Sequence, residues 1–264
     1  MSKAKIDLAN LDFSRTYSFE EFESINEQLK THSLEFNGQP VNLFDLDENG
    51  KLVPMPQATH CMGITVAEII RQLGNWNIQT RQNGDIKASQ GGFNFNVGGH
   101  RAPDVSFTPK SVSRQLTELQ RWTFQGQSFT PTFVVEVGDT ESRSTFEELD
   151  GKFKRGYFAL GTSVQLGWLI DPRNSKIWVY KRSQHGNVFR REHAWGDVEG
   201  GDILPGFTLN VLMIGEVISQ KSSESSSENE ELQINCPECD ATFSDRYTFT
   251  KHYVNKHVCK RRRT

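Results

Sequence analysis

The sequence predicts a mixed α+β domain, in which helices flank a sheet, followed by a small ββα unit that binds a metal. Three observations lead to this prediction. Segments with apolar residues three and four positions apart occur among short β-branched runs and Asn-Gly turns, which is the pattern of helices interspersed with strands. One of the strand-like runs, 133–137, is apolar except for a single glutamate. Three of the four cysteines and two of the histidines lie within residues 235–264.

Composition sets the limits of these expectations. With 264 residues, of which 35% are hydrophobic and 24% charged, the chain is long enough for one sizeable core and a small appendage. The formal net charge of −3 gives no overall sign of nucleic-acid binding, so such an activity must rest on local charge. No apolar run approaches the roughly 18 residues of a membrane span and no N-terminal leader is visible, so we expect an intracellular protein without a membrane partner.

The first part of the chain predicts a helix followed by hairpins. Residues 1–17 show no period and are expected to form a loose arm. Ser18 and Glu21 match a capping box, in which each side chain bonds the backbone N–H of the other residue, and apolar residues follow at helical spacing. Segment 34–55 alternates weakly and contains two Asn-Gly turns, which indicates short antiparallel strands.

The middle of the chain predicts a second helix and the strands that follow it. The helix is expected over residues 65–76, whose apolar side chains share one face. Glycine pairs flank an alternating stretch, 91–99, which we interpret as a hairpin strand and not as a phosphate-binding loop. A strand-like stretch, 101–107, comes next, and a helical stretch over 113–122 precedes the strand at 133–137.

The remainder of the main domain predicts one helix and one hairpin. Apolar residues continue at spacings of three and four over 146–160, and Gly161 closes that helix. Two apolar runs, 166–170 and 176–180, are joined by an Asp-Pro-Arg-Asn turn and form the hairpin. The expected organisation is an arm (1–17), a main domain (18–218), a Ser/Glu-rich linker (219–233), a Cys/His unit (234–259) and a basic tail (260–264).

Glu136 is the residue that the sequence first marks as functional, because it lies inside the apolar strand 133–137. Burying an ionised carboxylate without a partner costs several kcal/mol, so we expect a compensating metal or lysine nearby. Asp104 on the upstream strand offers a second acid, and Lys152 or Lys154 on the following helix offers a cation. The alternative is a glutamate at a strand end that reaches solvent or pairs with an arginine.

The C-terminal region carries ligands with the spacing of a structural zinc site. Cys236 and Cys239 form a Cys-x2-Cys pair, and His252 and His257 follow as His-x4-His after a gap of twelve residues. Zinc takes four tetrahedral sulfur and nitrogen ligands, which this spacing supplies from a hairpin and from one helix face. A unit of this length cannot fold on its own apolar core, so zinc would supply the folding free energy.

This tail resembles the Cys-Cys-His-His zinc finger family, because Phe243 and Phe249 also fall where that family has apolar residues. The resemblance implies that Asp245, Thr248 and Lys251 face DNA bases. One finger covers only about three base pairs, so it is expected to assist binding and not to specify a sequence. The basic run that follows is expected to contact phosphates or to act as a nuclear-import signal, and its residues are Lys260, Arg261, Arg262 and Arg263.

Two carboxylates on neighbouring strands and a nearby lysine are the groups that metal-assisted phosphodiester hydrolysis uses. Carboxylate oxygens hold magnesium, the metal polarises phosphate and water, and the lysine positions the attacking water or offsets charge. The order here is Asp104, Glu136, Lys152. Their surroundings include Arg-x-Pro-Asp-Val-x-Phe, Phe-Val-Val-Glu-Val, Gln-Leu-Gly-Trp-Leu-Ile-Asp-Pro and Leu-Pro-Gly-Phe. Over residues 18–214 this succession resembles the bacterial Uma-type restriction endonuclease family of the PD-(D/E)xK nuclease superfamily.

The resemblance implies a restriction-endonuclease-like fold with a mixed sheet between helices, and magnesium as the catalytic cofactor. It implies that Asp104 and Glu136 are catalytic acids that bind this metal and that Lys152 is the catalytic lysine. Gly138 stands where the superfamily pattern has its lysine, so Lys154 stays open as the alternative cation.

The family also has an additional N-terminal acid, which would fall near the turn at residues 50–53. Asp47 is the first candidate for it and Asp45 the second.

We therefore expect a metal-dependent DNA endonuclease, a hydrolase, with a structural zinc finger that assists its binding to DNA or another nucleic acid. The expected location is the nucleus, and a homodimer is the assembly that we consider. The alternative function is that of an adaptor, in which the nuclease fold has lost activity and binds nucleic acid or protein.

Overall fold

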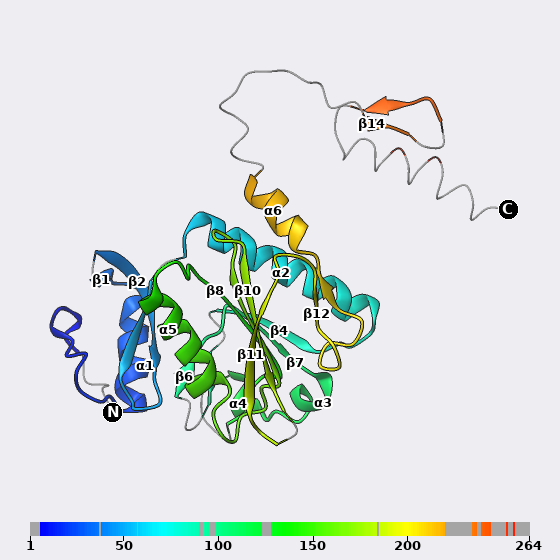
Figure 1. The fold of residues 1–264 in the computed structure, drawn as a ribbon. Coiled ribbons are helices and arrows are strands. Elements are labelled where there is room, and N and C mark those ends of the chain that lie inside the picture. Colours follow the sequence, from blue (N-terminus) through cyan, green and yellow to red (C-terminus); the bar gives the residue numbers. More distant parts are fainter. Residues whose placement is uncertain are drawn as a thin grey trace. The chain divides into compact units, whose positions relative to one another are not determined.

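The computed structural model divides the chain into two compact units, Met1–Gln220 and Lys221–Thr264, which are described separately (Figure 1). The residues that the structure describes are 6–36, 38–56, 58–89, 92–95, 99–122, 128–183, 185–219, 234–236, 239–243, 252 and 256. No described helix is both long enough and apolar enough to cross a membrane.

The first unit contains a six-stranded sheet with the strand order β11-β10-β9-β8-β7-β4. Neighbouring strands are antiparallel, except that β8 and β9 are parallel. The parallel pair requires a crossover connection, which the helical segment between these two strands supplies. The strands are β4 (Asp85–Ala88), β7 (Val105–Thr108), β8 (Phe133–Val137), β9 (Leu166–Asp171), β10 (Lys176–Arg182) and β11 (Val188–His193).

A smaller sheet has the order β1-β2-β6-β5, and β3 also pairs with β2. Only residues 102–104 separate β6 from β7 of the larger sheet, so the two sheets approach each other at this point. Its strands are β1 (Leu34–Phe36), β2 (Gln39–Leu46), β3 (Leu52–Pro56), β5 (Phe93–Asn94) and β6 (His100–Arg101). A separate short pair is formed by β12 (Val198–Glu199) and β13 (Thr208–Leu209).

Helices cover both faces of the larger sheet (Figure 1). One face packs on α2 and α6, and the other packs on α5 and the π-helix η3 that continues it. The helices are η1 (Leu8–Asn10), α1 (Phe19–Leu29), α2 (His60–Gln79), α3 (Lys110–Ser113), α4 (Glu118–Trp122), α5 (Arg143–Gly151), η3 (Lys152–Tyr157) and α6 (Val211–Ser219).

The alternation of side chains along β8 decides where Glu136 lies. Val135 and Val137 belong to the apolar cluster on the α2 face, whereas Val134 belongs to the cluster on the η3 face. Because successive side chains in a strand point to opposite faces, Glu136 shares the face of Val134 and is directed toward η3.

Several sequence predictions are confirmed by the fold. The capping box at Ser18 and Glu21 is present, with both reciprocal hydrogen bonds. The strands over 34–55 and the hairpin formed by β9 and β10 are also observed, and β5, which lies in the stretch 91–99 expected to form a hairpin strand, pairs with β6.

Other boundaries differ from the predictions. The expected loose arm packs instead against the α1 cluster through Ile6, Leu8, Leu11 and Phe13. The second helix begins at His60, earlier than expected, because Thr59 caps it. The helix expected over 113–122 is divided into α3 and α4.

The second unit contains the hairpin β14 (Ile234–Asn235) and β15 (Thr242–Phe243). The backbone N–H of Cys236 donates to the carbonyl of Ala241 at 2.8 Å, directly beyond the pairing of Asn235 with Thr242.

Candidate active site

Glu136 is buried on β8, with 4% of its surface exposed, and the cation expected beside it is Lys152. The Lys152 ammonium lies 3.1 Å from both carboxylate oxygens. The Tyr157 hydroxyl also donates a hydrogen bond to Glu136 Oε1. The burial of this carboxylate is therefore compensated by one cation and one neutral donor.

The π-helix η3 explains why Lys152 and Tyr157 reach the same carboxylate. Its hydrogen bonds join residues five apart, as from the Phe158 N–H to the Phe153 carbonyl at 2.9 Å. Residues i and i+5 consequently lie one turn apart on the same side, whereas in an α-helix they would diverge.

Lys154 points elsewhere, as expected for a residue two positions from Lys152. Its ammonium pairs with Asp150 at 2.7 Å, and 45% of its side chain is exposed. Of the two candidate lysines, the structure brings only Lys152 to Glu136.

Asp104 reaches the same place from the neighbouring strand. It directly precedes Val105, which lies opposite Val135 in the antiparallel register. Its Oδ2 accepts a hydrogen bond from the backbone N–H of Val137 at 2.8 Å. The two acids that the sequence singled out therefore face each other, Asp104 directly before β7 and Glu136 on β8.

A third acid comes from the smaller sheet, and it is Asp45. Its Oδ1 accepts a hydrogen bond from the Ala102 N–H at 3.1 Å, and its Oδ2 lies 3.4 Å from Lys152 Nζ. This Oδ2 is buried without a hydrogen-bond partner among the described residues. The structure therefore brings the second candidate, Asp45, to Lys152, whereas the first candidate, Asp47, accepts hydrogen bonds from the N–H groups of Asn49 and Lys51 in its own turn, each at 2.8 Å.

Burial dominates the electrostatics of this group. It raises the pKa of Glu136 to about 7, against the opposing effect of Lys152. It also raises the pKa values of Asp45 and Asp104. Burial alone would lower the pKa of Lys152, but the surrounding carboxylates, with Glu136 foremost, raise it above its ordinary value. The site therefore holds a firmly protonated lysine among carboxyl groups that ionise reluctantly.

A cavity of about 770 Å³ lies against the acids. Asp45, Asp104 and Arg101 line it, together with the aromatic rings of Phe93 and His100. Two of the three acids can therefore be approached from this cavity, whose volume is in the range of small-molecule sites.

Sequence reasoning did not identify Tyr157 as a site residue or place Asp45 first. The only signal for Tyr157 was its position five residues after Lys152, which matters only in a π-helix. Asp45 can be identified as a site residue only from the pairing of Leu46 with His100, which brings the end of β2 beside β6 and the Ala102 N–H.

The donor types of the three acids fit a hard divalent cation, since all are carboxylates and one oxygen of Asp45 lacks a hydrogen bond. In the described part of the chain, however, the group whose ligand atoms all lie within 4.8 Å of one another is Cys236, Cys239 and His252. The acids are thus spaced more widely, with Lys152 between Asp45 and Glu136.

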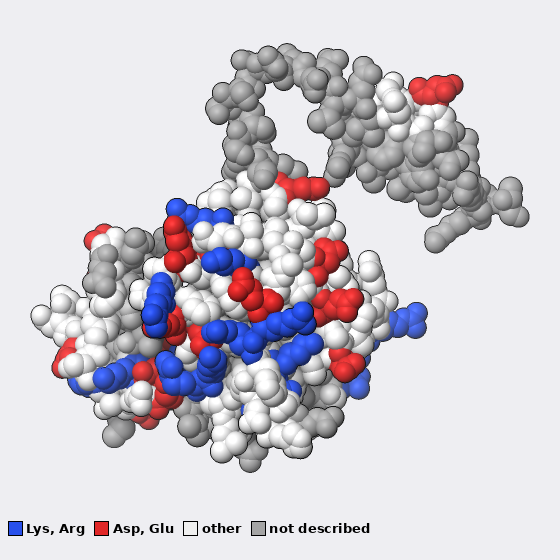
Figure 2. Space-filling view, viewed as in Figure 1, with Lys and Arg blue, Asp and Glu red and all other residues white. Residues whose placement is uncertain are grey.

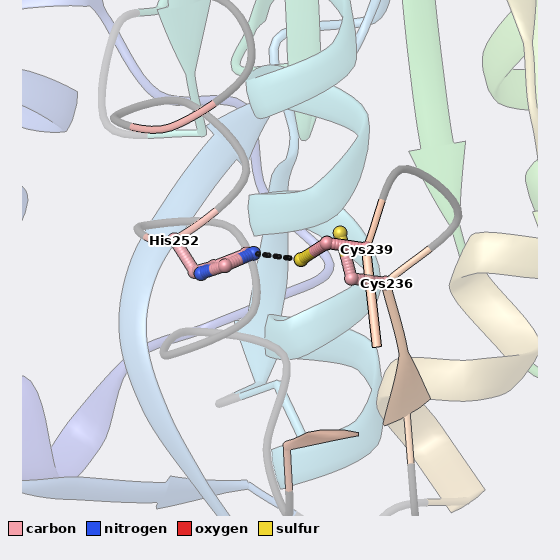
Figure 3. Close-up of side chains that lie close together, drawn as sticks. All are labelled: Cys236, Cys239 and His252. Carbon is pink, nitrogen blue, oxygen red and sulfur yellow. Dashed lines mark hydrogen bonds between the residues drawn. The ribbon is translucent and has the colours of Figure 1, made fainter. Parts of the chain in front are cut away.

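The second unit brings three of the expected zinc ligands together (Figure 3). Cys239 Sγ lies 3.3 Å from His252 Nε2, and the Phe243 ring lies 4.7 Å from the His252 ring. Two thiolates and an imidazole at such separations fit the tetrahedral chemistry of zinc. The expected fourth ligand and nucleic-acid contacts lie outside the described residues, and they are His257, Asp245, Thr248, Lys251, Lys260, Arg261, Arg262 and Arg263.

Comparison with known proteins shows which family the chain resembles. The model of the Uma2 family, described as "Putative restriction endonuclease", matches residues 30–212. No curated protein matches the chain. A similar solved structure is a "putative nuclease belonging to DUF820" from Anabaena variabilis ATCC 29413, with 15% identity and a TM-score of 0.47. That match covers 66% of this chain and 90% of the other.

Proposed function

The chain belongs to the Uma2 family of restriction-endonuclease-like proteins, and from this premise we propose that it is a metal-dependent endonuclease that hydrolyses phosphodiester bonds in DNA. The observation that carries the proposal is the position of Lys152, whose ammonium lies within 3.4 Å of the carboxylates of both Asp45 and Glu136. Asp104 directly precedes the adjoining strand β7. A largely buried lysine that gathers with three carboxylates from two sheets has no evident structural purpose that apolar residues would not serve better.

Asp45, Asp104 and Glu136 would hold the metal, which we take to be magnesium. When bound, it would act as a Lewis acid on the phosphate and lower the pKa of its water. Lys152 would orient the attacking water or neutralise the charge that develops on the phosphate. Tyr157 fixes the carboxylate of Glu136 through its hydroxyl, and this contact preorganises the site.

The second unit would assist nucleic-acid binding. We propose that zinc joins Cys236, Cys239 and His252 with His257 as the fourth ligand, and that the module thereby becomes a finger with a basic tail. Its contribution would be electrostatic affinity more than sequence selection. Nuclear localisation through the basic run at 260–263 remains part of this proposal.

The test is nicking of supercoiled plasmid DNA by the full chain in the presence of magnesium. Wild-type protein is expected to nick, whereas Glu136→Gln is expected to lose at least about 100-fold in rate. The matched control is Glu147→Gln, which neutralises an exposed glutamate that pairs with Arg143 on α5. If wild type and Glu136→Gln nick equally slowly, the endonuclease proposal fails and the inactive adaptor becomes the better description.

A further inference from the structure

Glu48 joins two arginines at the edge of the candidate active site. It follows β2 and is 20% exposed. Its Oε2 accepts a hydrogen bond from Arg101 Nη2 at 2.8 Å, and its Oε1 accepts one from Arg155 Nε at 2.9 Å. Because one carboxylate serves two guanidinium groups, this group of three side chains carries a net positive charge.

Each of the two arginines lies close to a residue of the acid-lysine set. Arg101 directly precedes Ala102, whose N–H binds Asp45, and it lines the same cavity as Asp45. Arg155 follows Lys152 by three residues on η3. Gly156 allows the Arg101 side chain to pack closely against η3, since a Cβ at position 156 would lie only 2.9 Å from Arg101 Cδ.

The two arginines differ in exposure, which suggests different roles. The Arg101 side chain is 5% exposed, so Glu48 holds it in place. The Arg155 side chain is 66% exposed, and its ion pair with Glu48 is of the kind that contributes at most about 1 kcal/mol. Arg155 can therefore exchange Glu48 for another anion at little cost.

A phosphodiester is the anion that fits this arrangement. Guanidinium groups bind phosphate oxygens through paired, charge-assisted hydrogen bonds, and two convergent arginines would hold one phosphate firmly. Figure 2 shows further Lys and Arg side chains in a band over the face where α5 and β11 lie, with acidic side chains among them. A backbone along this face would meet additional positive charge.

We propose that Arg155 and Arg101 form a phosphate clamp for a nucleic-acid backbone and that Glu48 occupies this clamp until the backbone binds. The inference rests on the proposed function, because it takes a phosphodiester to be the substrate. It deepens that function by assigning a binding step to residues outside the acid-lysine set.

The test measures binding without cleavage, in magnesium-free buffer, by fluorescence anisotropy of a labelled DNA duplex over a series of salt concentrations. Arg155→Ala is expected to weaken binding several-fold at low salt and to reduce the salt slope by about one. Glu48→Gln is expected to act in the opposite direction, because it frees Arg155 while its amide oxygen still accepts from Arg101. An RNA strand of the same sequence, used as a second probe, distinguishes the two sources of phosphodiester.

Arg143→Ala is the matched control. Arg143 also pairs with a glutamate and is 90% exposed. It is the first residue of α5, the helix that η3 continues, and in the described part of the chain it makes no ion pair with Glu48. The proposal is overturned if Arg155→Ala matches wild type or has only the effect of Arg143→Ala, or if Glu48→Gln weakens binding.

Unfolding midpoints check that the variants are folded. If Arg155→Ala binds DNA as wild type does and the wild-type protein nicks plasmid, the clamp alone is rejected. If Arg155→Ala and Glu48→Gln change DNA binding as expected but the wild-type protein does not nick plasmid, the clamp is kept and the endonuclease proposal is rejected.

Discussion

At the scale of single residues, the site depends on one ammonium group held among several acids. Lys152 lies 3.1 Å from Glu136 and 3.4 Å from Asp45, and 14% of its side chain is exposed. Desolvation of each ion is unfavourable, so the arrangement is stable only as a set. Without the Lys152 ammonium, the carboxyl groups of Asp45 and Glu136 would have to stay protonated or move apart.

Lys152→Met tests this dependence. The variant keeps the length of the side chain but removes its charge, and we expect destabilisation of about 3–5 kcal/mol because buried carboxylates lose their partner. Plasmid nicking is expected to fall at least about 100-fold. Thermal unfolding and the nicking assay measure the two effects.

Lys154→Met is the control, since its charge pairs with Asp150 at a more exposed position. Its cost should stay near that of a surface ion pair, at most about 1 kcal/mol. Equal effects of the two substitutions would contradict the assignment of Lys152.

The sequence was sufficient to predict that Asp104, Glu136 and a lysine, either Lys152 or Lys154, lie together, because an isolated acid in an apolar strand requires compensation nearby. It did not separate Asp45 from Asp47, since both lie in one acidic stretch before a turn. Only the pairing of β2 with β6 directs Asp45 into the site and leaves Asp47 to cap its own turn.

At the scale of elements, helices and strands could be predicted well from the sequence where the apolar residues recur at regular spacing. The sequence did not predict the π-helix η3, because the apolar spacing over 146–160 is compatible with a continuous α-helix. It also missed β11 as a strand, since an edge strand with mostly exposed side chains shows no apolar alternation. Tertiary pairing supplies what the local pattern lacks.

Gly156→Ala tests the close approach of η3 to the smaller sheet. The added Cβ would lie 2.9 Å from Arg101 Cδ, inside van der Waals contact, while Arg101 is held by Glu48. We expect a destabilisation of about 1–3 kcal/mol from this overpacking, together with slower nicking because Lys152 shifts with η3. Denaturant unfolding and the nicking rate measure both.

Gly74→Ala provides the comparison in α2, where an added Cβ meets no atom within 4 Å. It is expected to stabilise the protein by about 0.5–1 kcal/mol, because alanine favours a helix interior over glycine. A Gly156→Ala protein as stable as wild type would show that η3 does not need this contact.

At the scale of the whole molecule, the two units depend on different sources of stability. Among the described residues, the three apolar clusters of the first unit consist of residues from Ile6 to Ile218. Among the described residues, the second unit offers a short hairpin, the Phe243–His252 contact and three metal ligands. At the proposed zinc site, the metal would supply the folding free energy that a unit of that size lacks.

Cys236→Ser is therefore expected to remove one zinc per chain, measured by atomic emission, and to leave the main unfolding transition of the first unit unchanged. The thiolate is a ligand that serine does not replace for zinc, whereas the first unit contains none of the three grouped ligands. DNA affinity should decrease while the nicking rate at saturating plasmid is retained, because the proposed finger would assist binding, whereas the acids and the lysine of the proposed nuclease site lie in the first unit. Cys61→Ser, at an exposed position in α2, should retain the zinc. Full zinc content in Cys236→Ser would refute the zinc assignment, and a lower main transition would show that the first unit depends on the second.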